Sequence, residues 1–139
     1  MKPLFSTLAL CLFMIIGNFQ NSFAQQMDKQ NYVVLTKNVQ QLKPILLAAE
    51  ALANQDGEDF GNFEIIVCGK TIGDSTNLEV MQPHLEKAQL IGANIVACGF
   101  SLNRFKVDRK RIPKDMKIVK NGILYNFQLQ KQGYLSLEL

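Results

Sequence analysis

The sequence predicts an α/β domain, a three-layer α/β/α sandwich with a mostly parallel five-stranded sheet. Two observations favour this fold. Short, continuous runs of apolar and β-branched residues are typical of strands covered on both faces. Five such runs alternate with segments of helical periodicity, which favours crossover connections between parallel strands. The strands are expected at 32–36, 63–67, 94–97, 116–119 and 134–139.

The first two connecting segments carry apolar residues at helical spacing and have recognisable ends. Asn38 is expected to cap the first helix, which ends near Asn54. A loop over 70–82 leads to the second helix. Pro83 suits the first turn of that helix, and Gly92 suits its C-terminus.

The last two connecting segments also contain helix signals. Ser101 is expected to cap a short helix that must end before Pro113. Asn121 is expected to cap the final helix, which Gly133 closes. That helix carries the apolar side chains Ile123, Leu124 and Phe127.

The N-terminal segment is typical of a signal peptide. Lys2 precedes an apolar run over 4–16, and Ser22-Phe23-Ala24 has the small-residue pattern of a cleavage site. The run is shorter than the roughly 20 residues of a membrane span, although an uncleaved N-terminal anchor is the alternative. We therefore expect residues 1–24 to be removed and 25–139 to form one domain, periplasmic or secreted, without a membrane span.

The charge of the predicted mature chain is nearly balanced, with 14 of the 15 basic residues against 12 acidic ones. This balance favours neither nucleic-acid binding nor membrane attraction. Its distribution is uneven, because eight of the basic residues lie within 104–120. Such a run is usually a solvated face.

Several familiar sites are excluded by the residues present. Gly69-Lys70-Thr71 resembles the end of a phosphate-binding loop, but Glu64 stands where that motif requires glycine. His84 is the single histidine, so neither a histidine-based metal cluster nor a Ser-His-Asp relay can form. We expect no metal and no other cofactor.

Two cysteines remain after the expected cleavage, and both follow a predicted strand. In parallel sheets, ligands bind at the carboxyl ends of the strands, so Cys68 and Cys98 are expected at the functional edge. If their strands are neighbours, the sulfurs can approach disulfide range. If the first strand lies between them, the separation is about twice 4.8 Å and no bridge forms.

Cys98 is the stronger candidate for a reactive sulfur, and Cys68 is the secondary one. Gly99 permits close approach of a ligand, and helix amides near Ser101 can face the sulfur. Arg104, Lys106 and Arg109 can add positive potential, and each factor lowers a thiol pKa. The alternative is that both cysteines are inert, buried side chains.

Residues 96–102, Val-Ala-Cys-Gly-Phe-Ser-Leu, resemble the A-C-G-x-[ST] turn of the DsrE/DsrF-like family. Ile112-Pro113, Gly122 and the segment 130–134, Gln-Lys-Gln-Gly-Tyr, follow in a similar order, so the resemblance covers residues 32–139. It implies a five-stranded α/β/α domain assembled into trimers or hexamers. It also implies that Cys98 carries sulfane sulfur as a persulfide and exchanges it with a donor or acceptor protein. Phe100 departs from the polar residue common in that family, and the relay members are cytoplasmic.

Three functional hypotheses therefore stand. The first is an exported sulfur carrier that acts through Cys98, with Gly99, Ser101, Arg104 and Lys106 as binding residues. The second is a non-enzymatic oligomeric module that binds a small anion or a partner protein at the same edge. The third is a redox couple of Cys68 and Cys98.

Overall fold

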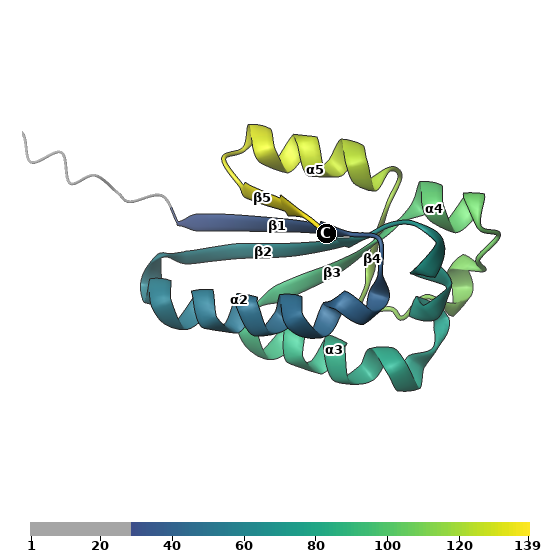
Figure 1. Ribbon diagram of the computed structural model, residues 1–139, viewed down its shortest axis with the longest axis horizontal. Helices are drawn as coiled ribbons and strands as arrows, with labels where there is room; N and C mark the ends of the chain where they lie inside the picture. Colours follow the sequence, from purple (N-terminus) through teal and green to yellow (C-terminus); the bar gives the residue numbers. More distant parts are fainter. Residues whose placement is uncertain (1–28) are drawn as a thin grey trace, which may run out of the picture.

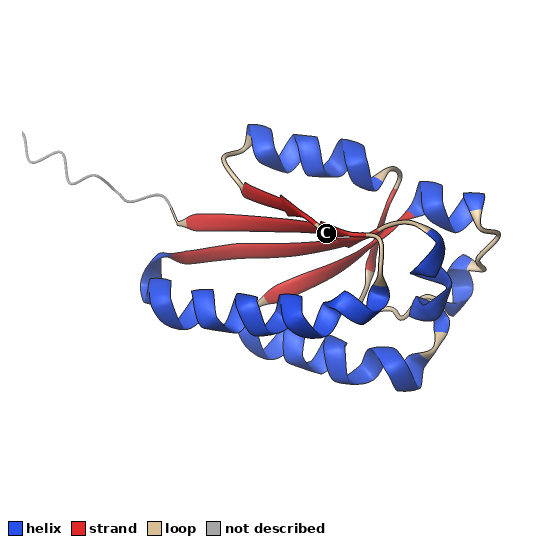
Figure 2. Ribbon diagram, in the orientation of Figure 1, coloured by secondary structure: helices blue, strands red, loops and turns tan. Residues whose placement is uncertain are grey.

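The computed structural model describes residues 29–139, so the expected signal peptide lies outside the described residues. Five parallel strands form one sheet in the order β4-β3-β2-β1-β5. The strands are β1 (Gln30–Thr36), β2 (Phe60–Val67), β3 (Ala93–Cys98), β4 (Lys117–Val119) and β5 (Leu135–Glu138). The predicted α/β class is confirmed, and within the described residues the sheet is entirely parallel (Figure 2).

The helices cover the two faces of the sheet unequally. Helices α2 (Leu42–Asp56) and α3 (Leu78–Ile91) pack on one face, and α5 (Gly122–Lys131) packs on the other (Figure 1). The short α4 (Gly99–Arg104) and the 3-10 turns η1 (Val39–Gln41), η3 (Lys70–Thr76) and η4 (Arg109–Arg111) follow the carboxyl ends of strands, and η2 (Gly57–Asp59) precedes β2. None of these described helices is both long and apolar enough to span a membrane.

The central strands form the core because both of their faces are covered. Ile65 and Ile66 of β2 and Val96 and Ala97 of β3 are fully buried. Leu46 and Met81 seal one face from α2 and α3. Burying a Leu, Ile or Phe side chain contributes about 1.5–3 kcal/mol, so this continuous run of residues holds the sheet edge rigid.

The chain order creates a switch point in the sheet. From β1 the chain moves outwards through β2 and β3 to β4, and α5 then returns it to β5 on the other side of β1. Because α2 follows β1 on one face while α5 enters β5 from the opposite face, the connections diverge there (Figure 1). Such a point is where open α/β sheets bind their ligands, outside the carboxyl ends of the strands.

Two helix starts differ from the sequence-based expectation. Helix α3 begins at Leu78, capped by the Asn77 side chain, which accepts hydrogen bonds from Glu79 and Val80. Pro83 therefore lies inside the helix rather than in its first turn, and the predicted loop over 70–82 is mostly η3 and the start of α3. Proline leaves only the Glu79 carbonyl without its helical partner, and Glu79 is exposed to solvent.

Helix α4 begins three residues earlier than expected. Cys98 itself occupies the N-cap position, and Ser101 lies within the helix. The prediction that Ser101 caps this helix was wrong because its hydroxyl is engaged elsewhere, as the acceptor of the Gly69 amide. The expected cap at Asn121 and the terminating glycines at 92 and 133 are confirmed, both glycines having positive φ.

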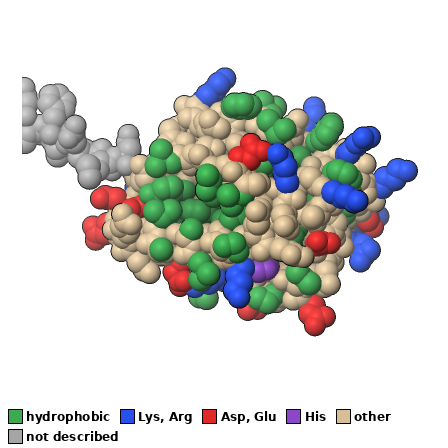
Figure 3. Space-filling view, viewed as in Figure 1, with side chains coloured by type: hydrophobic (Ala, Val, Ile, Leu, Met, Phe, Trp, Pro, Cys, Tyr) green, Lys and Arg blue, Asp and Glu red, His purple; other side chains and the backbone are tan. Residues whose placement is uncertain are grey.

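Helix α5 exposes most of the apolar side chains noted in its sequence. Ile123, Leu124 and Phe127 are each more than half exposed, whereas Gly122 and Leu129 are the buried residues of the helix. A second apolar surface lies on the opposite face of the sheet, where α2 leaves β5 uncovered. Leu135 and Leu137 are exposed there beside Val34 and Leu52, and Figure 3 shows hydrophobic side chains gathered over this region.

Candidate functional site

The two cysteines lie side by side at the carboxyl edge of the sheet. Strands β2 and β3 are neighbours, with Val67 paired to Ala97, so Cys68 and Cys98 occupy the next positions in register. Both are free thiols, and both are buried. Adjacent strands lie about 4.8 Å apart, which is within the Cα separation that a disulfide requires. The arrangement in which β1 separates them is excluded.

Gly122, the first residue of α5, lies directly over the two sulfurs. Its N–H donates a hydrogen bond to Cys98 Sγ at 3.2 Å. A Cβ at this position would lie 2.6 Å from Cys68 Sγ and 3.1 Å from Cys98 Cβ. Only glycine therefore allows the start of α5 to approach this closely. The positive end of the helix dipole consequently faces the cysteine pair.

Ser101 contacts the pair from the opposite side, through α4. Its hydroxyl accepts a hydrogen bond from the Gly69 N–H at 3.0 Å and lies close enough to the Cys98 sulfur to lower the pKa of that thiol. Its backbone N–H also faces that sulfur. Both contacts follow from α4 starting immediately after Cys98, which turns the first amides of the helix back towards the strand end.

These contacts determine the charge state of Cys98. Burial raises the pKa of its thiol, but the hydrogen bonds outweigh burial and leave the pKa below the ordinary value. The donors, in decreasing order of effect, are the Ser101 hydroxyl, the Gly122 amide, the Ser101 amide and the Cys68 thiol. Hydrogen bonds to the charged form stabilise it, so the site favours a thiolate at Cys98.

Cys68 behaves in the opposite way. Burial, then the negative charge of Cys98 and a hydrogen bond to it, raise the pKa of its thiol to about 12. Ser101 and the nearby ammonium of Lys37 act in the other direction. The two thiols therefore differ in acidity, and Cys98 is the one that ionises first.

A groove leads to this pair from the switch point. It has a volume of about 420 Å³ and lies between α5 and the ends of β1 and β5. We call it the α5 groove; its wall includes Lys37, Cys68, Ile123, Phe127, Ser136 and Glu138. Lys37 and Glu138 form an ion pair across it, with 2.5 Å between Nζ and Oε1. Cys68, and not Cys98, contributes to the wall.

The other predicted site residues differ in whether they contribute to the cysteine pair. Gly99 belongs to the site for a packing reason, since a Cβ there would lie 2.7 Å from the Val119 carbonyl oxygen. The expectation that Arg104 and Lys106 support the thiolate was wrong. Both are exposed, and neither is among the causes of the pKa shift of Cys98. Arg104 is the last residue of α4, and Lys106 follows the helix.

Arg109 is the basic residue that returns to the turn. Its Nη2 donates to the Gly99 carbonyl at 3.3 Å and to Asn103 Oδ1 at 3.2 Å. It therefore fastens the backbone of the Cys98-Gly99 turn without contacting a sulfur through any of its hydrogen bonds.

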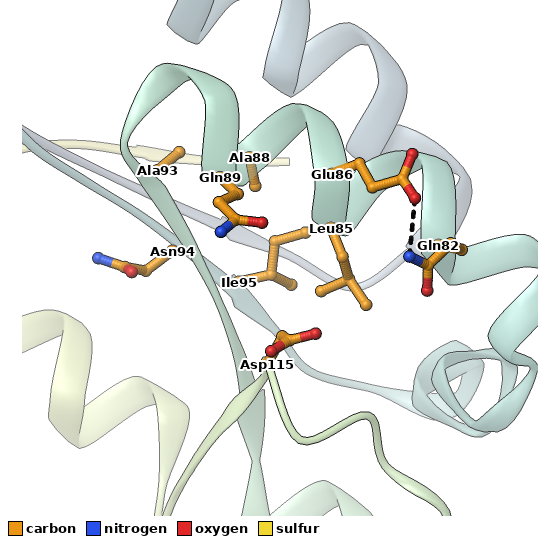
Figure 4. Close-up of a pocket in the computed structure, with 9 residues that line it drawn as sticks. All are labelled: Gln82, Leu85, Glu86, Ala88, Gln89, Ala93, Asn94, Ile95 and Asp115. Atoms are coloured by element: carbon orange, nitrogen blue, oxygen red, sulfur yellow. Dashed lines mark hydrogen bonds between the residues drawn. The ribbon is translucent and has the colours of Figure 1, made fainter.

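Another hollow lies away from the cysteines, between α3 and the start of β3 (Figure 4). Its volume is about 230 Å³, and Leu85, Ile95 and Asp115 line it. Gln82 donates a hydrogen bond to Glu86 at its rim, at 2.8 Å. The hollow opens at the amino end of β3, and no cysteine, serine or histidine lines it, so it offers no chemistry comparable to the cysteine pair. His84 is half-buried on the same helix, and burial and the charge of Lys43 lower its pKa.

Sequence reasoning missed two residues of the site. Gly122 was noted as part of a pattern, but its contact with both sulfurs depends on α5 crossing the far face of the sheet. Lys37 immediately follows β1 and could have been noticed as a cation at the carboxyl edge. In the described part of the chain, no three His, Cys, Asp or Glu side chains gather as a metal-binding group.

Comparisons with known proteins establish the fold alone. No family model matches the chain, and no curated protein matches it. Among solved structures, it is similar to a protein of unknown function, MTH1491 from Methanobacterium thermoautotrophicum. The TM-score is 0.52 at 16% sequence identity, and the match covers 79% of this chain and 100% of the other.

Proposed function

We propose that this protein is an exported sulfur carrier that accepts a sulfane sulfur atom on Cys98. The thiolate attacks the outer sulfur of a donor hydropersulfide, R–S–SH. The donor S–S bond breaks, R–S⁻ leaves, and Cys98–S–SH forms, so atoms and charge balance. The observation that carries the proposal is the 3.2 Å hydrogen bond from the Gly122 amide to a buried sulfur. A thiolate is the nucleophilic form of cysteine, and these donors lower the pKa of the Cys98 thiol below its ordinary value.

The α5 groove supports the same function by bringing a donor to Cys68, the immediate neighbour of Cys98. Its apolar rim, formed by Ile123 and Phe127, suits a partner protein or the carbon chain of a small persulfide. The Lys37–Glu138 pair offers one positive and one negative group beside it. The resemblance of residues 96–102 to the DsrE/DsrF-like turn favours the same reaction class, with a thiol protein as donor or acceptor.

Peptide-resolved mass spectrometry after exposure to polysulfide tests this function. The expected result, measured in a Cys68→Ser background so that the second thiol cannot react, is one added sulfur atom on the peptide that contains Cys98, blocked when Cys98→Ser is added. Phe100→Ser is a matched control, because Phe100 is exposed beside the same turn and makes no part of the groove wall. An unmodified Cys98, or the same adduct in the Cys98→Ser protein, would exclude the carrier function.

A second candidate is a non-enzymatic module that binds a small anion or a partner protein in the α5 groove. The groove volume and the Lys37 ammonium favour it. It predicts that alkylation of both cysteines leaves binding intact, whereas Lys37→Glu abolishes it. For a sulfur carrier the order is reversed, because alkylation of the cysteines abolishes its function and Lys37→Glu affects it less.

The proposal includes a homo-oligomer whose contact is a second copy of the chain at β5. In the strand order β4-β3-β2-β1-β5, β5 is an edge strand, so its outward-facing backbone groups can pair with another strand. Two β5 strands related by a two-fold axis would run antiparallel and bring Leu135 and Leu137 of both copies together.

Export is tested by the mass of the protein from the culture, which should correspond to a chain that begins at Gln25.

A further inference from the structure

The sulfur-carrier proposal leaves the role of the second thiol unassigned. Cys68 forms part of the α5 groove wall, donates a hydrogen bond to Cys98 and contacts Gly122. A purely structural cysteine needs none of these contacts, since a small hydrophobe would fill the same space. The question is therefore what a thiol does beside a sulfur that carries an extra sulfur atom.

We propose that Cys68 is a resolving thiol, which attacks Cys98 Sγ of the persulfide and releases the sulfane sulfur as sulfide. The inference rests on the proposed function, because it starts from Cys98–S–SH. The reaction is Cys68–SH plus Cys98–S–SH giving a Cys68–S–S–Cys98 disulfide and H₂S. One S–S bond forms and one breaks. The sulfane sulfur is reduced by two electrons, both thiol sulfurs are oxidised, and the Cys68 proton leaves with the sulfide.

The backbone geometry permits this bond. Cys68 and Cys98 follow the paired residues Val67 and Ala97 on adjacent parallel strands. Their side chains project to the same face, where α5 starts, since both contact the Cβ position of Gly122. Strand spacing of about 4.8 Å lies inside the range of Cα separations in disulfides.

The charges around Cys68 change in the direction that the step needs. In the resting protein the negative charge of Cys98 and the hydrogen bond to it hold the Cys68 proton in place. When Cys98 Sγ is bonded to a sulfane atom, it no longer carries the thiolate charge. The contacts from Ser101 and Lys37, which favour the Cys68 thiolate, then remain. Burial, the largest cause of the raised Cys68 pKa, is unchanged, but loading Cys98 removes the other two causes and so lowers the pKa of Cys68 from its resting value.

The location of Cys68 gives the products a path. Because Cys68 lies in the wall of the groove, sulfide formed beside it can leave through about 420 Å³ of open space. The disulfide then needs two electrons to return to the starting dithiol. A dithiol reductant supplies them by thiol–disulfide exchange, attacking first at Cys68, the sulfur that the groove reaches. The protein would thus convert sulfane sulfur and a dithiol into sulfide and a disulfide.

The test compares the wild-type protein with Cys68→Ser under argon. Each is exposed to polysulfide, separated from excess reagent by gel filtration, and followed for released sulfide, free thiols and peptide mass. The wild type is expected to release one sulfide per loaded chain and to form the Cys68–Cys98 disulfide. The Cys68→Ser variant is expected to keep its Cys98 persulfide until dithiothreitol is added. Unloaded wild type under argon is the control for adventitious oxidation.

The possible failures are distinguishable. If Cys98 of the wild type loads but its persulfide lasts as long as in Cys68→Ser, the resolving role is overturned and the carrier function stands. If neither protein gains sulfur, both proposals fail. The disulfide in the wild-type protein is measured without any variant, so the test does not depend on Cys68→Ser folding normally.

Discussion

Replacing Ser101 with alanine tests the origin of the Cys98 thiolate. Ser101 is 5% exposed, and its hydroxyl is the strongest of the donors that lower the pKa of Cys98. A hydrogen bond to a charged group contributes about 1.5–3 kcal/mol. Since one pKa unit corresponds to about 1.36 kcal/mol, Ser101→Ala should raise the pKa of Cys98 by about 1–2 units.

The measurement is the ultraviolet absorbance of the thiolate as a function of pH. It suits a buried sulfur because it requires no reagent to reach the site. Cys98→Ser provides the blank that removes the contribution of every other titrating group. Cys68 does not interfere in the neutral range, since burial and the neighbouring charge raise its pKa to about 12. Ser101→Ala also leaves the Gly69 amide without its acceptor.

Ser75→Ala is the matched control. Ser75 is fully buried, and among the described residues its hydroxyl has no hydrogen-bond partner. The same substitution there removes an unpaired polar group, so it should leave the Cys98 titration unchanged and stability equal or higher. A Cys98 midpoint that is unmoved by Ser101→Ala, or that moves equally with Ser75→Ala, would refute the hydrogen-bond origin of the thiolate.

Three further predictions concern the glycine contact, the pH dependence of stability and the oligomer. Gly122→Ala should move the start of α5 off the sulfurs and raise the pH midpoint of the Cys98 titration by about one pH unit or more. Gly73→Ala is the control, because a Cβ there would meet only Val107 at 3.8 Å and should leave the midpoint unchanged. The pKa of the Cys68 thiol is about 12 in the folded protein and near 8.5 in the unfolded chain. The protonated thiol therefore contributes stability that is fully present below about pH 8.5 and is lost as the pH rises through the folded-state pKa. Denaturant titrations between pH 9 and about 11 should therefore show wild type losing up to about 1.4 kcal/mol per pH unit more than Cys68→Ala, and parallel losses would contradict this. Leu137→Lys should give the monomer mass by light scattering, with exposed Leu90→Lys as the control that keeps the oligomer.

The sequence predicted the layout of the sheet because the signals involved are local. Each strand is a short apolar run, and each observed strand overlaps its predicted range. Asn121 was expected as a helix cap and accepts hydrogen bonds from Ile123 and Leu124. A cap, a turn and a buried run each depend on a few neighbouring residues, so they can be recognised without knowing the rest of the fold.

The start of α3 was predicted wrongly because two local signals competed. Pro83 is typical of the first turn of a helix. Asn77 lies more than one helical turn upstream, and its side chain caps the helix there by accepting hydrogen bonds from two amides. The earlier start also places Met81 in the core, where it is fully buried. Burying such a side chain contributes about 1.5–3 kcal/mol, which offsets the single helical hydrogen bond that proline removes.

The site itself depends on contacts between distant segments. Gly122 lies 24 residues from Cys98, and their hydrogen bond exists only because α5 returns across the sheet to reach β5. The strand order that makes Cys68 and Cys98 neighbours likewise could not be chosen from the sequence, which allowed two arrangements. The basic residues near Cys98 in the sequence were misleading for the same reason, since Arg104 is exposed at the end of α4.

The contrast between the two cysteines shows how strongly backbone direction controls sulfur chemistry. Both stand at a strand end, and each is followed by glycine. At Cys68 the next residue, Gly69, has φ of +77°, and the chain turns aside into η3. At Cys98 the chain continues directly into α4, so the Ser101 amide faces the sulfur that precedes the helix. Gly122 then adds its amide to Cys98 while its missing side chain makes room for Cys68. One dipeptide therefore produces the more acidic thiol and the other the less acidic one, and their contact gives the site both a nucleophile and a proton donor.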